Sequence, residues 1–296
     1  DPKIFTSKNL KYYFSNNNYI PINNNLIDQI FKFKEKKTKP FYSLKKNIIG
    51  ESHHSKILKV ANFLKSNKAD YLFISAPENV AWLLNIRGYD NPNSPIPNAR
   101  LIISKNKKLF LITKKDNIKK IIKEKKINKD HVIDIKDLPN LINNLKGGNF
   151  ITDNKSCSVF YENIIKSRFK ILDKDDPIYK LKSIKNIHEI NHMIVAHKKD
   201  GLALTKFIYW IKNINKKTIT EVEAQNKLEK FRKLSKEYLF PSFNTIAGSG
   251  PNGAIVHYRA TTKKTKKINK KDILLVDSGG QYSYGTTDVT RTICFT

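Results

Sequence analysis

Residues 272–280, Asp-Ile-Leu-Leu-Val-Asp-Ser-Gly-Gly, predict a buried strand that ends in an acid, Asp277. Residues 281–285 predict a turn, and residues 286–295 predict a return strand that carries a second acid, Asp288. If the two strands pair as a hairpin, the carboxylates face each other, where like charges repel unless a cation lies between them. This stretch therefore predicts the outline of a site for two metal ions.

Each acid also has a purely structural interpretation. An Asp before Ser-Gly-Gly is a good turn initiator, so Asp277 alone does not distinguish a turn from a metal site. Asp288, however, lies within the β-prone residues 286–292, where Asp is disfavoured. Together the two acids favour metal binding. Oxygen-rich sites suit Mn²⁺, Mg²⁺ or Zn²⁺, and two such ions about 3.5–4 Å apart can generate a bridging hydroxide and polarise a carbonyl.

Two carboxylates cannot fill two coordination shells, so further His or Glu ligands must come from elsewhere. The nearest candidate in this chain is His257, which closes the run Ala-Ile-Val after a glycine-rich turn at residues 248–253. The alternative is a half-buried histidine satisfied by a carbonyl group. We weigh contact of His257 with a substrate or a metal above that alternative.

Two other stretches match known motifs literally. Residues 188–192, His-Glu-Ile-Asn-His, follow the H-E-x-x-H pattern of zinc peptidases on a predicted helix. We interpret this match as chance, because both histidines point away from the expected buried stripe of that helix, Ile187, Ile190 and Ile194. Residues 248–253 match G-x-G-x-x-G, but β-prone residues 254–258 follow instead of the required helix, which favours a turn.

Length and composition limit the class of protein. A chain of 296 residues predicts two or more domains. It has no apolar run of about 18 residues and no signal-peptide pattern at its start, so we expect a cytoplasmic protein without a membrane partner. Cys157 and Cys294 match no metal or redox spacing and are typical of inert thiols in a reducing compartment.

The formal net charge of +30 raises the question of a nucleic-acid partner. Nearly all of this charge is lysine spread through every segment, whereas a nucleic-acid face favours arginine with interleaved aromatic side chains. We therefore expect a solvated lysine coat and no nucleic-acid partner.

Along the chain, the pattern predicts three parts. Residues 1–40 contain a short helical pattern around residues 26–31 and a lysine run. From residue 41 to 175, helices and strands alternate, which predicts a compact α/β domain. Residues 176–296 begin with a helix over 186–211 and a second helix from Thr220, which forms a capping box with Glu223, and then turn to strands, which predicts an α+β half-domain.

Three ordered stretches resemble the catalytic-domain motifs of Xaa-Pro aminopeptidases (aminopeptidase P), in the creatinase, prolidase and methionine-aminopeptidase superfamily. They are Ser-Gly-Pro-Asn-Gly-Ala-Ile-Val-His-Tyr at 249–258, Asp-Ser-Gly-Gly-Gln-Tyr at 277–282 and Gly-Thr-Thr-Asp-Val-Thr-Arg-Thr at 285–292. Upstream, residues 79–88, Asn-Val-Ala-Trp-Leu-Leu-Asn-Ile-Arg-Gly, resemble the creatinase-type N-terminal domain of the large three-domain form.

The resemblance implies a creatinase-type N-terminal α/β domain followed by the first half of a pita-bread catalytic domain. Residues 1–40 would then be the tail of a preceding domain and a linker, residues 41–175 the second domain and residues 176–296 the catalytic half-domain. The chain would be truncated at both ends. For Trp82 and Arg87 we favour a packing role over a wall at the substrate entrance.

The resemblance also implies the chemistry. Asp277 would chelate one divalent metal ion, Asp288 would bridge two, and His257 would contact substrate as a catalytic residue. Mn²⁺ is favoured over Zn²⁺ or Co²⁺. One His and two Glu ligands would come from later strands absent here, so this piece alone would be inactive.

For the complete protein, the implied reaction removes the N-terminal residue from peptides with proline in second position, through a hydroxide that bridges the metals. A homodimer is implied. The alternative is a non-catalytic pita-bread module that binds peptides or proteins, against which Asp277 and Asp288 argue; a prolidase or creatinase is the nearer enzyme alternative.

Overall fold

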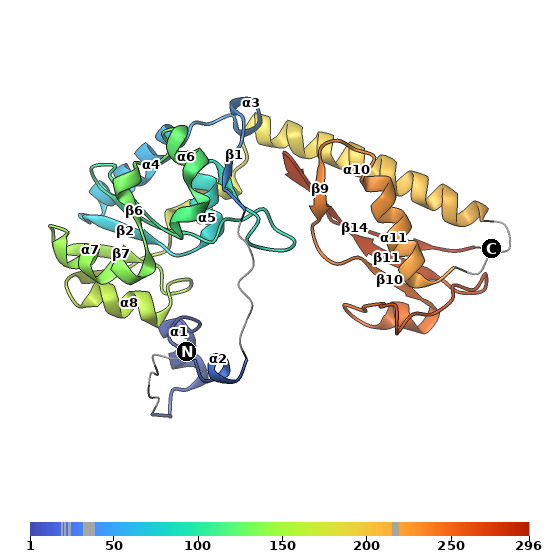
Figure 1. Cartoon of the computed structure of the whole chain (residues 1–296), viewed down its shortest axis with the longest axis horizontal. Helices are drawn as coiled ribbons and strands as arrows, with labels where there is room; N and C mark the ends of the chain where they lie inside the picture. Colours follow the sequence, from blue (N-terminus) through green and yellow to red (C-terminus); the bar gives the residue numbers. More distant parts are fainter. Residues whose placement is uncertain (19, 21, 23–24, 32–38, 215–218, 296) are drawn as a thin grey trace. The chain divides into compact units, whose positions relative to one another are not determined.

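The computed structural model describes residues 1–18, 20, 22, 25–31, 39–214 and 219–295 (Figure 1). The chain divides into two compact units, one of residues 1–91 and 95–185 and one of residues 92–94 and 186–296. We expected a domain boundary after residue 175. The structure instead places the boundary after residue 185. Helix α9 (Pro177–Ser183) belongs to the first unit, because it contacts α4 (His53–Ser66) and α5 (Pro77–Leu84). The three-part domain assignment itself stays a prediction.

A six-stranded mixed sheet forms the centre of the first unit, in the order β6-β5-β4-β2-β7-β8. Its strands are β2 (Tyr71–Ile74), β4 (Arg100–Ser104), β5 (Leu109–Ile112), β6 (Val132–Ile133), β7 (Asn149–Thr152) and β8 (Lys170–Asp173). β2 pairs antiparallel with β4 and parallel with β7. The alternation predicted for residues 41–175 is therefore confirmed as an α/β architecture.

Helices cover both faces of this sheet (Figure 1). Successive residues of β2 point to opposite faces, so Leu72 and Ile74 join one buried cluster and Tyr71 and Phe73 join the other. The first cluster also takes residues from α4, α5, α9 and α6 (Lys119–Lys123), and the second from α7 (Leu138–Asn144) and α8 (Val159–Lys166).

Short elements complete the first unit: α1 (Ser7–Tyr13), α2 (Leu26–Ile30), α3 (Lys46–Ile49) and a two-stranded ladder of β1 (Tyr42–Ser43) with β3 (Ile86–Arg87). The first residues of the chain lie beside α8, where the N–H of Val159 donates to Phe5 O at 2.9 Å. The helical pattern expected around residues 26–31 is confirmed as α2. Most of the lysine run, residues 32–38, lies outside the described residues.

The second unit packs two helices, α10 (Ile187–Asn213) and α11 (Glu221–Arg232), on a sheet in the order β10-β11-β14. These strands are Ile246–Ser249, Leu274–Ser278 and Val289–Ile293. A second sheet, β13-β12-β9, consists of Gly285–Thr286, Gly280–Tyr282 and Tyr238–Pro241. The capping box predicted at Thr220 is confirmed, with the Glu223 N–H donating to Thr220 Oγ1 at 3.2 Å.

The expectation of one buried apolar face along α10 holds in its second half, where Leu204 and Ile211 are buried, and is wrong in its first half. The predicted apolar stripe is exposed in its first half, with exposed fractions of 62%, 43% and 48% at Ile187, Ile190 and Ile194. Small and polar residues, Ala196 and Asp200, are buried there instead. The reason is a close approach of β13, where a Cβ added to Gly285 would lie 2.8 Å from Ala196 Cβ. At Ala196, the side of α10 that faces β13 therefore accepts only a small side chain.

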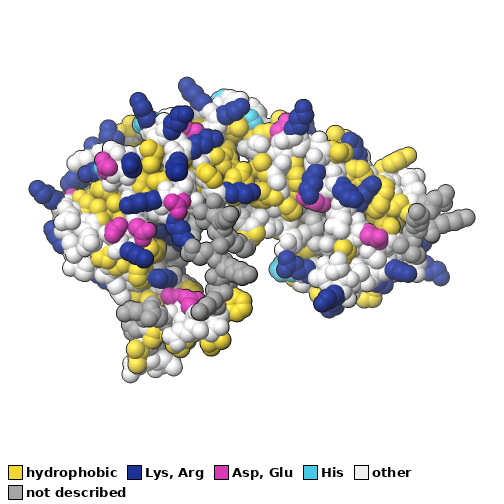
Figure 2. Space-filling model, in the orientation of Figure 1, with side chains coloured by type: hydrophobic (Ala, Val, Ile, Leu, Met, Phe, Trp, Pro, Cys, Tyr) yellow, Lys and Arg dark blue, Asp and Glu magenta, His cyan; other side chains and the backbone are white. Residues whose placement is uncertain are grey.

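Basic side chains are dispersed over the visible face of the molecule (Figure 2). The absence of a nucleic-acid partner stays a prediction. No helix in the described ranges is both long enough and apolar enough to cross a membrane. Cys157 is a buried free thiol, and burial raises its pKa to about 12, whereas Cys294 is exposed.

Candidate metal and substrate site

The two candidate acids lie on one long antiparallel hairpin that continues through both sheets of the second unit. In the first sheet Asp277 pairs with Thr290 and Ser278 with Val289, and in the second Gln281 pairs with Thr286. Both strands have two residues between these ladders, 279–280 and 287–288, so the register does not change. The N–H of Thr287 donates to Gly280 O at 2.9 Å within this interval. The turn is confined to residues 283–284, shorter than expected.

This register places Asp288 opposite Gly279 and diagonal to Asp277. Because side chains alternate along a strand, Asp288 shares a face with Thr290 and hence with Asp277. Diagonal neighbours in an antiparallel pair lie about 7–8 Å apart, within the reach of two carboxylates that share cations. The hairpin expected from the sequence is confirmed. The assignment of its two acids as metal ligands stays a prediction.

Gly279 makes room at this point of the hairpin. A Cβ at residue 279 would collide with the carbonyl oxygen of Thr287 and the hydroxyl of Ser242. Ser242 uses the space, since its N–H donates to Gly279 O at 3.1 Å and its hydroxyl donates to Thr287 O at 2.8 Å. Ser242 thus holds both strands of the hairpin beside Asp288.

The two carboxylates differ in their surroundings. Asp277 is half-buried, and its Oδ1 accepts a hydrogen bond from Thr290 Oγ1 at 2.8 Å. Asp288 is exposed, and no residue in the described part of the chain forms a hydrogen bond or ion pair with it. Carboxylate oxygens fit hard divalent cations. Over the described ranges no third His, Cys, Asp or Glu joins them in a cluster able to hold a metal ion.

His257 lies on a loop and not on a strand. We expected residues 254–258 to be β-prone, but β10 ends at residue 249 and a 3₁₀ helix, Gly250–Ala254, follows it. This also gives the G-x-G-x-x-G match a turn-like conformation. His257 itself is exposed and has a backbone φ of 56°, in the left-handed region that ordinary residues avoid. The expectation that it contacts substrate stays a prediction.

The loop that carries His257 is attached to Glu221, a residue that no sequence pattern singled out. The Glu221 side chain is fully buried, and its two oxygens accept hydrogen bonds from residues on both sides of His257. Burial, followed by the hydrogen bond to Glu221, raises the pKa of Tyr258, which keeps that hydroxyl a donor. As an acid in the first turn of a helix, Glu221 resembles many residues of no special role.

A second group that sequence reasoning missed lies behind the strand of Asp277. Arg232 and Asp200 form a fully buried bidentate pair, with Nε to Oδ1 at 2.7 Å and Nη2 to Oδ2 at 3.1 Å. Arg232 Nη2 also donates to Ser278 Oγ at 3.0 Å, and Tyr282 donates to Asp200 Oδ1 at 2.9 Å. The pair therefore joins both helices to the hairpin.

The H-E-x-x-H stretch has a structural role at its Glu. Glu189 completes a capping box with Asn186, whose N–H donates to Glu189 Oε2 at 2.9 Å. His188 is exposed, and its carbonyl oxygen lies 2.8 Å from His192 Nδ1. The His192 ring contacts Tyr284, with centroids 5.3 Å apart. These contacts support our interpretation that the H-E-x-x-H match is due to chance. The argument from a buried stripe does not contribute, because Ile187, Ile190 and Ile194 are exposed.

Trp82 and Arg87 make contacts inside the first unit. Lys56 Nζ lies 3.8 Å from the centroid of the Trp82 ring and donates to Trp82 O at 3.1 Å. Arg87 donates to Ile86 O at 2.8 Å. Both contacts support the packing role that we favoured.

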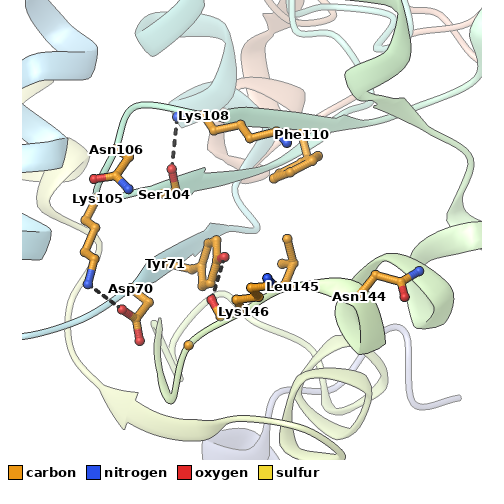
Figure 3. Close-up of a pocket in the computed structure, with 11 residues that line it drawn as sticks. Asp70, Tyr71, Ser104, Lys105, Asn106, Lys108, Phe110, Asn144, Leu145 and Lys146 are labelled. Carbon is orange, nitrogen blue, oxygen red and sulfur yellow. Dashed lines mark hydrogen bonds and ion pairs between the residues drawn. The ribbon is translucent and has the colours of Figure 1, made fainter.

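A cavity of about 540 Å³ lies in the first unit, between the start of β2, the β4–β5 turn and the residues that follow α7 (Figure 3). Three of its charged residues, Asp70, Lys105 and Lys108, already have partners, because Lys105 Nζ lies 2.8 Å from Asp70 Oδ1 and the Lys108 amino group lies over the Phe110 ring. None of the unpartnered buried polar atoms in the described ranges lines it. We therefore place the candidate site on the hairpin.

Comparisons with known proteins agree with this fold. Residues 33–189 match the Creatinase/Prolidase N-terminal domain, and residues 191–296 match Metallopeptidase family M24. The chain therefore belongs to the creatinase/prolidase family and combines that N-terminal domain with an M24 domain.

Among its relatives, Xaa-Pro aminopeptidase ApepP of Drosophila melanogaster is 32% identical over 286 residues, which cover 93% of this chain and 46% of that protein. A probable Xaa-Pro aminopeptidase P of Paracoccidioides brasiliensis is 32% identical over 320 residues, which cover 100% of this chain and 52% of that protein. This chain spans about half the length of these curated relatives. The crystal structure of an X-prolyl aminopeptidase from Caenorhabditis elegans, described as a cytosolic enzyme with a di-nuclear active site, superposes with a TM-score of 0.84 at 25% identity, covering 94% of this chain and 47% of that one.

Proposed function

We propose that the complete protein containing this chain is a metallopeptidase that releases the N-terminal residue from peptides with proline in second position. The observation that carries the proposal is the hairpin register, which sets Asp277 and Asp288 diagonally on one face beside the space left by Gly279. The names of the relatives support the substrate class.

Asp277 and Asp288 would hold two divalent ions together with ligands from outside this chain. Bound there, such ions supply Lewis-acid polarisation of a carbonyl and a nucleophile at neutral pH. Thr290 orients Asp277 through Oδ1 and leaves Oδ2 without another hydrogen bond among the described residues. His257 would contact the peptide. Proline has no amide N–H and a fixed φ, so a pocket without an acceptor for that N–H selects it.

We extend the proposal to Mn²⁺ as the metal, a homodimer as the assembly and the cytoplasm as the location. The family resemblance supports the first two, and the description of the nematode enzyme as cytosolic supports the third. We also propose that residues 1–296 alone do not catalyse the reaction, because they supply two of the five ligands that the resemblance implies.

The test is Asp288→Asn in the full-length protein. Excess Mn²⁺ should raise the melting temperature of the unmodified protein, since a ligand at 100 times its Kd stabilises the native state by about 2.7 kcal/mol. Asp288→Asn should abolish that shift. It should also lower Xaa-Pro cleavage by more than the roughly 10–100-fold that loss of an outer-shell partner costs. The metal-free variant should stay as stable as the parent, because Asp288 is exposed and its charge lies near that of Asp277.

His192→Ala is the matched control, because it removes a histidine of the same unit from a motif that we assign to chance. It should keep both the Mn²⁺ shift and the activity. A full Mn²⁺ shift in Asp288→Asn would refute the assignment of this acid. A Mn²⁺ shift without cleavage of Xaa-Pro peptides would instead favour a non-catalytic binding module.

A further inference from the structure

The buried carboxylate of Glu221 organises the loop before and after His257. Oε1 accepts from the Ser249 N–H at 2.8 Å and from Asn252 Nδ2 at 2.9 Å. Oε2 accepts from the Tyr258 hydroxyl and the Lys266 N–H, both at 2.9 Å. A carboxylate has about four acceptor positions and no donor, so all of its positions are used.

No cationic side chain in the described ranges forms an ion pair with Glu221. Its charge is balanced by these four donors and by its place as the first residue of α11, a 12-residue helix whose N-terminus carries partial positive charge. A neutral amide cannot replace it without loss, because its NH₂ group would face two donors. The site is therefore specific for a carboxylate.

The residues that supply the four donors flank His257 in the sequence. Ser249 and Asn252 precede it, Tyr258 follows it directly, and Lys266 lies further on. Asn252 Nδ2 also lies 2.9 Å from the Tyr258 hydroxyl, which closes the group. His257 has a strained φ of 56°, and such a conformation persists only where the surroundings impose it. Two kinds of hydrogen bond hold the residues around it: the Tyr258 N–H donates to Ile255 O at 3.1 Å, and the donors on both sides of His257 bind Glu221.

We propose that Glu221 is a positioning residue for His257: it fixes the left-handed backbone at His257 and so the direction in which the imidazole meets a peptide substrate. This inference rests on the proposed function of His257. Glu221 itself touches neither substrate nor metal, and it acts only through the loop that it holds.

A double-mutant cycle in the full-length protein tests the proposal. Glu221→Gln should raise the KM for an Xaa-Pro peptide between about 10- and 100-fold, as expected when a binding group is misplaced by about 1 Å, while the Mn²⁺ shift is kept. His257→Ala should have an effect of similar size. The double variant should be no worse than His257→Ala alone, because the two residues act through one contact.

The matched control is Glu223→Gln, two residues along the same helix. Glu223 is on the exposed capping box, and Gln preserves that box, so KM should not change. Tyr258→Phe removes one of the four donors and should shift KM in the same direction by a smaller factor. This variant also decides the question if Glu221→Gln does not fold.

A second readout does not depend on activity. The imidazole NMR signals of His257, assigned by comparison with His257→Ala, should move in Glu221→Gln and Tyr258→Phe and stay in place in Glu223→Gln. Unmoved signals, or effects on KM that add in the double variant, would overturn the proposal and leave Glu221 a merely structural residue. If the unmodified protein cleaves no Xaa-Pro peptide, the proposed function fails, and the NMR signals still decide whether Glu221 positions His257.

Discussion

Gly279 shows how strongly one missing side chain can determine a site. Its Cα faces the carbonyl oxygen of Thr287 and the hydroxyl of Ser242, with no space for a methyl group. Gly279→Ala should therefore push the two strands apart beside Asp288. We expect a loss of more than about 3 kcal/mol in the free energy of unfolding, measured by urea denaturation, because the obstacle is backbone and cannot rotate away.

Gly201 in α10 is the control for that substitution. A Cβ at Gly201 would meet nothing within 4 Å, and the residue lies inside a helix. Gly201→Ala should thus stabilise the protein by about 0.5–1 kcal/mol through the lower helix propensity of glycine. Equal effects of the two substitutions would contradict the role assigned to Gly279.

At the residue scale, the sequence identified what a local pattern can show. Asp288 was recognisable because an acid is unusual in a β-prone run, and Asp277 because it closes a buried strand. Glu221 and Arg232 gave no such signal, because an acid at the start of a helix and a base at its end are ordinary. Their burial depends on partners 28 or more residues away in sequence.

At the scale of elements, the buried pair Asp200–Arg232 joins α10 and α11 to the hairpin. Asp200→Asn would take this counter-charge away from the buried Arg232 guanidinium and would place an NH₂ donor against its Nη2. We expect a cost of about 3–5 kcal/mol in urea denaturation, as for other buried pairs that lose one partner. Tyr282 keeps its acceptor in this variant, because the Asn side chain retains Oδ1, so the cost comes from the Arg232 contact alone.

The adjacent residue provides a control. Lys199 forms an ion pair with Glu237 at 2.6 Å, but both side chains are more than a third exposed. Lys199→Gln should cost less than about 1 kcal/mol, because solvent screens an exposed pair. Comparable losses in Lys199→Gln and Asp200→Asn would show that burial does not set the strength of the Asp200–Arg232 pair.

Element prediction succeeded where local chemistry determines the element and failed where packing does. The capping box at Thr220 and the alternation of helices and strands around the six-stranded sheet follow from local residues and were predicted. The buried side of α10 and the loop at His257 depend on β13 and on Glu221, which are distant in sequence. Periodicity shows that a helix has an apolar stripe, but not that another element covers it.

At the scale of the whole molecule, the two units have separate hydrophobic cores. We therefore expect this chain to unfold in two thermal transitions. Each unit contains one of the two tryptophans, Trp82 in the first and Trp210 in the second. Fluorescence of Trp210→Phe should report the first unit alone, and that of Trp82→Phe the second.

The two single-tryptophan variants should have different midpoints. Identical midpoints and slopes would show that the units unfold as one cooperative body. Calorimetry of the unmodified chain checks the same point, because two independent units give a calorimetric enthalpy larger than the van't Hoff enthalpy of a single transition.

The unbroken register of the hairpin also limits how its length can change during evolution. Inserting or deleting one residue in either strand would move every later side chain to the opposite face, and Asp277 and Asp288 would no longer share one. Length changes are tolerable only at the turn, residues 283–284, where they leave both strands in phase. Aligned homologues that keep both acids should therefore vary in length at the turn and nowhere else along this hairpin.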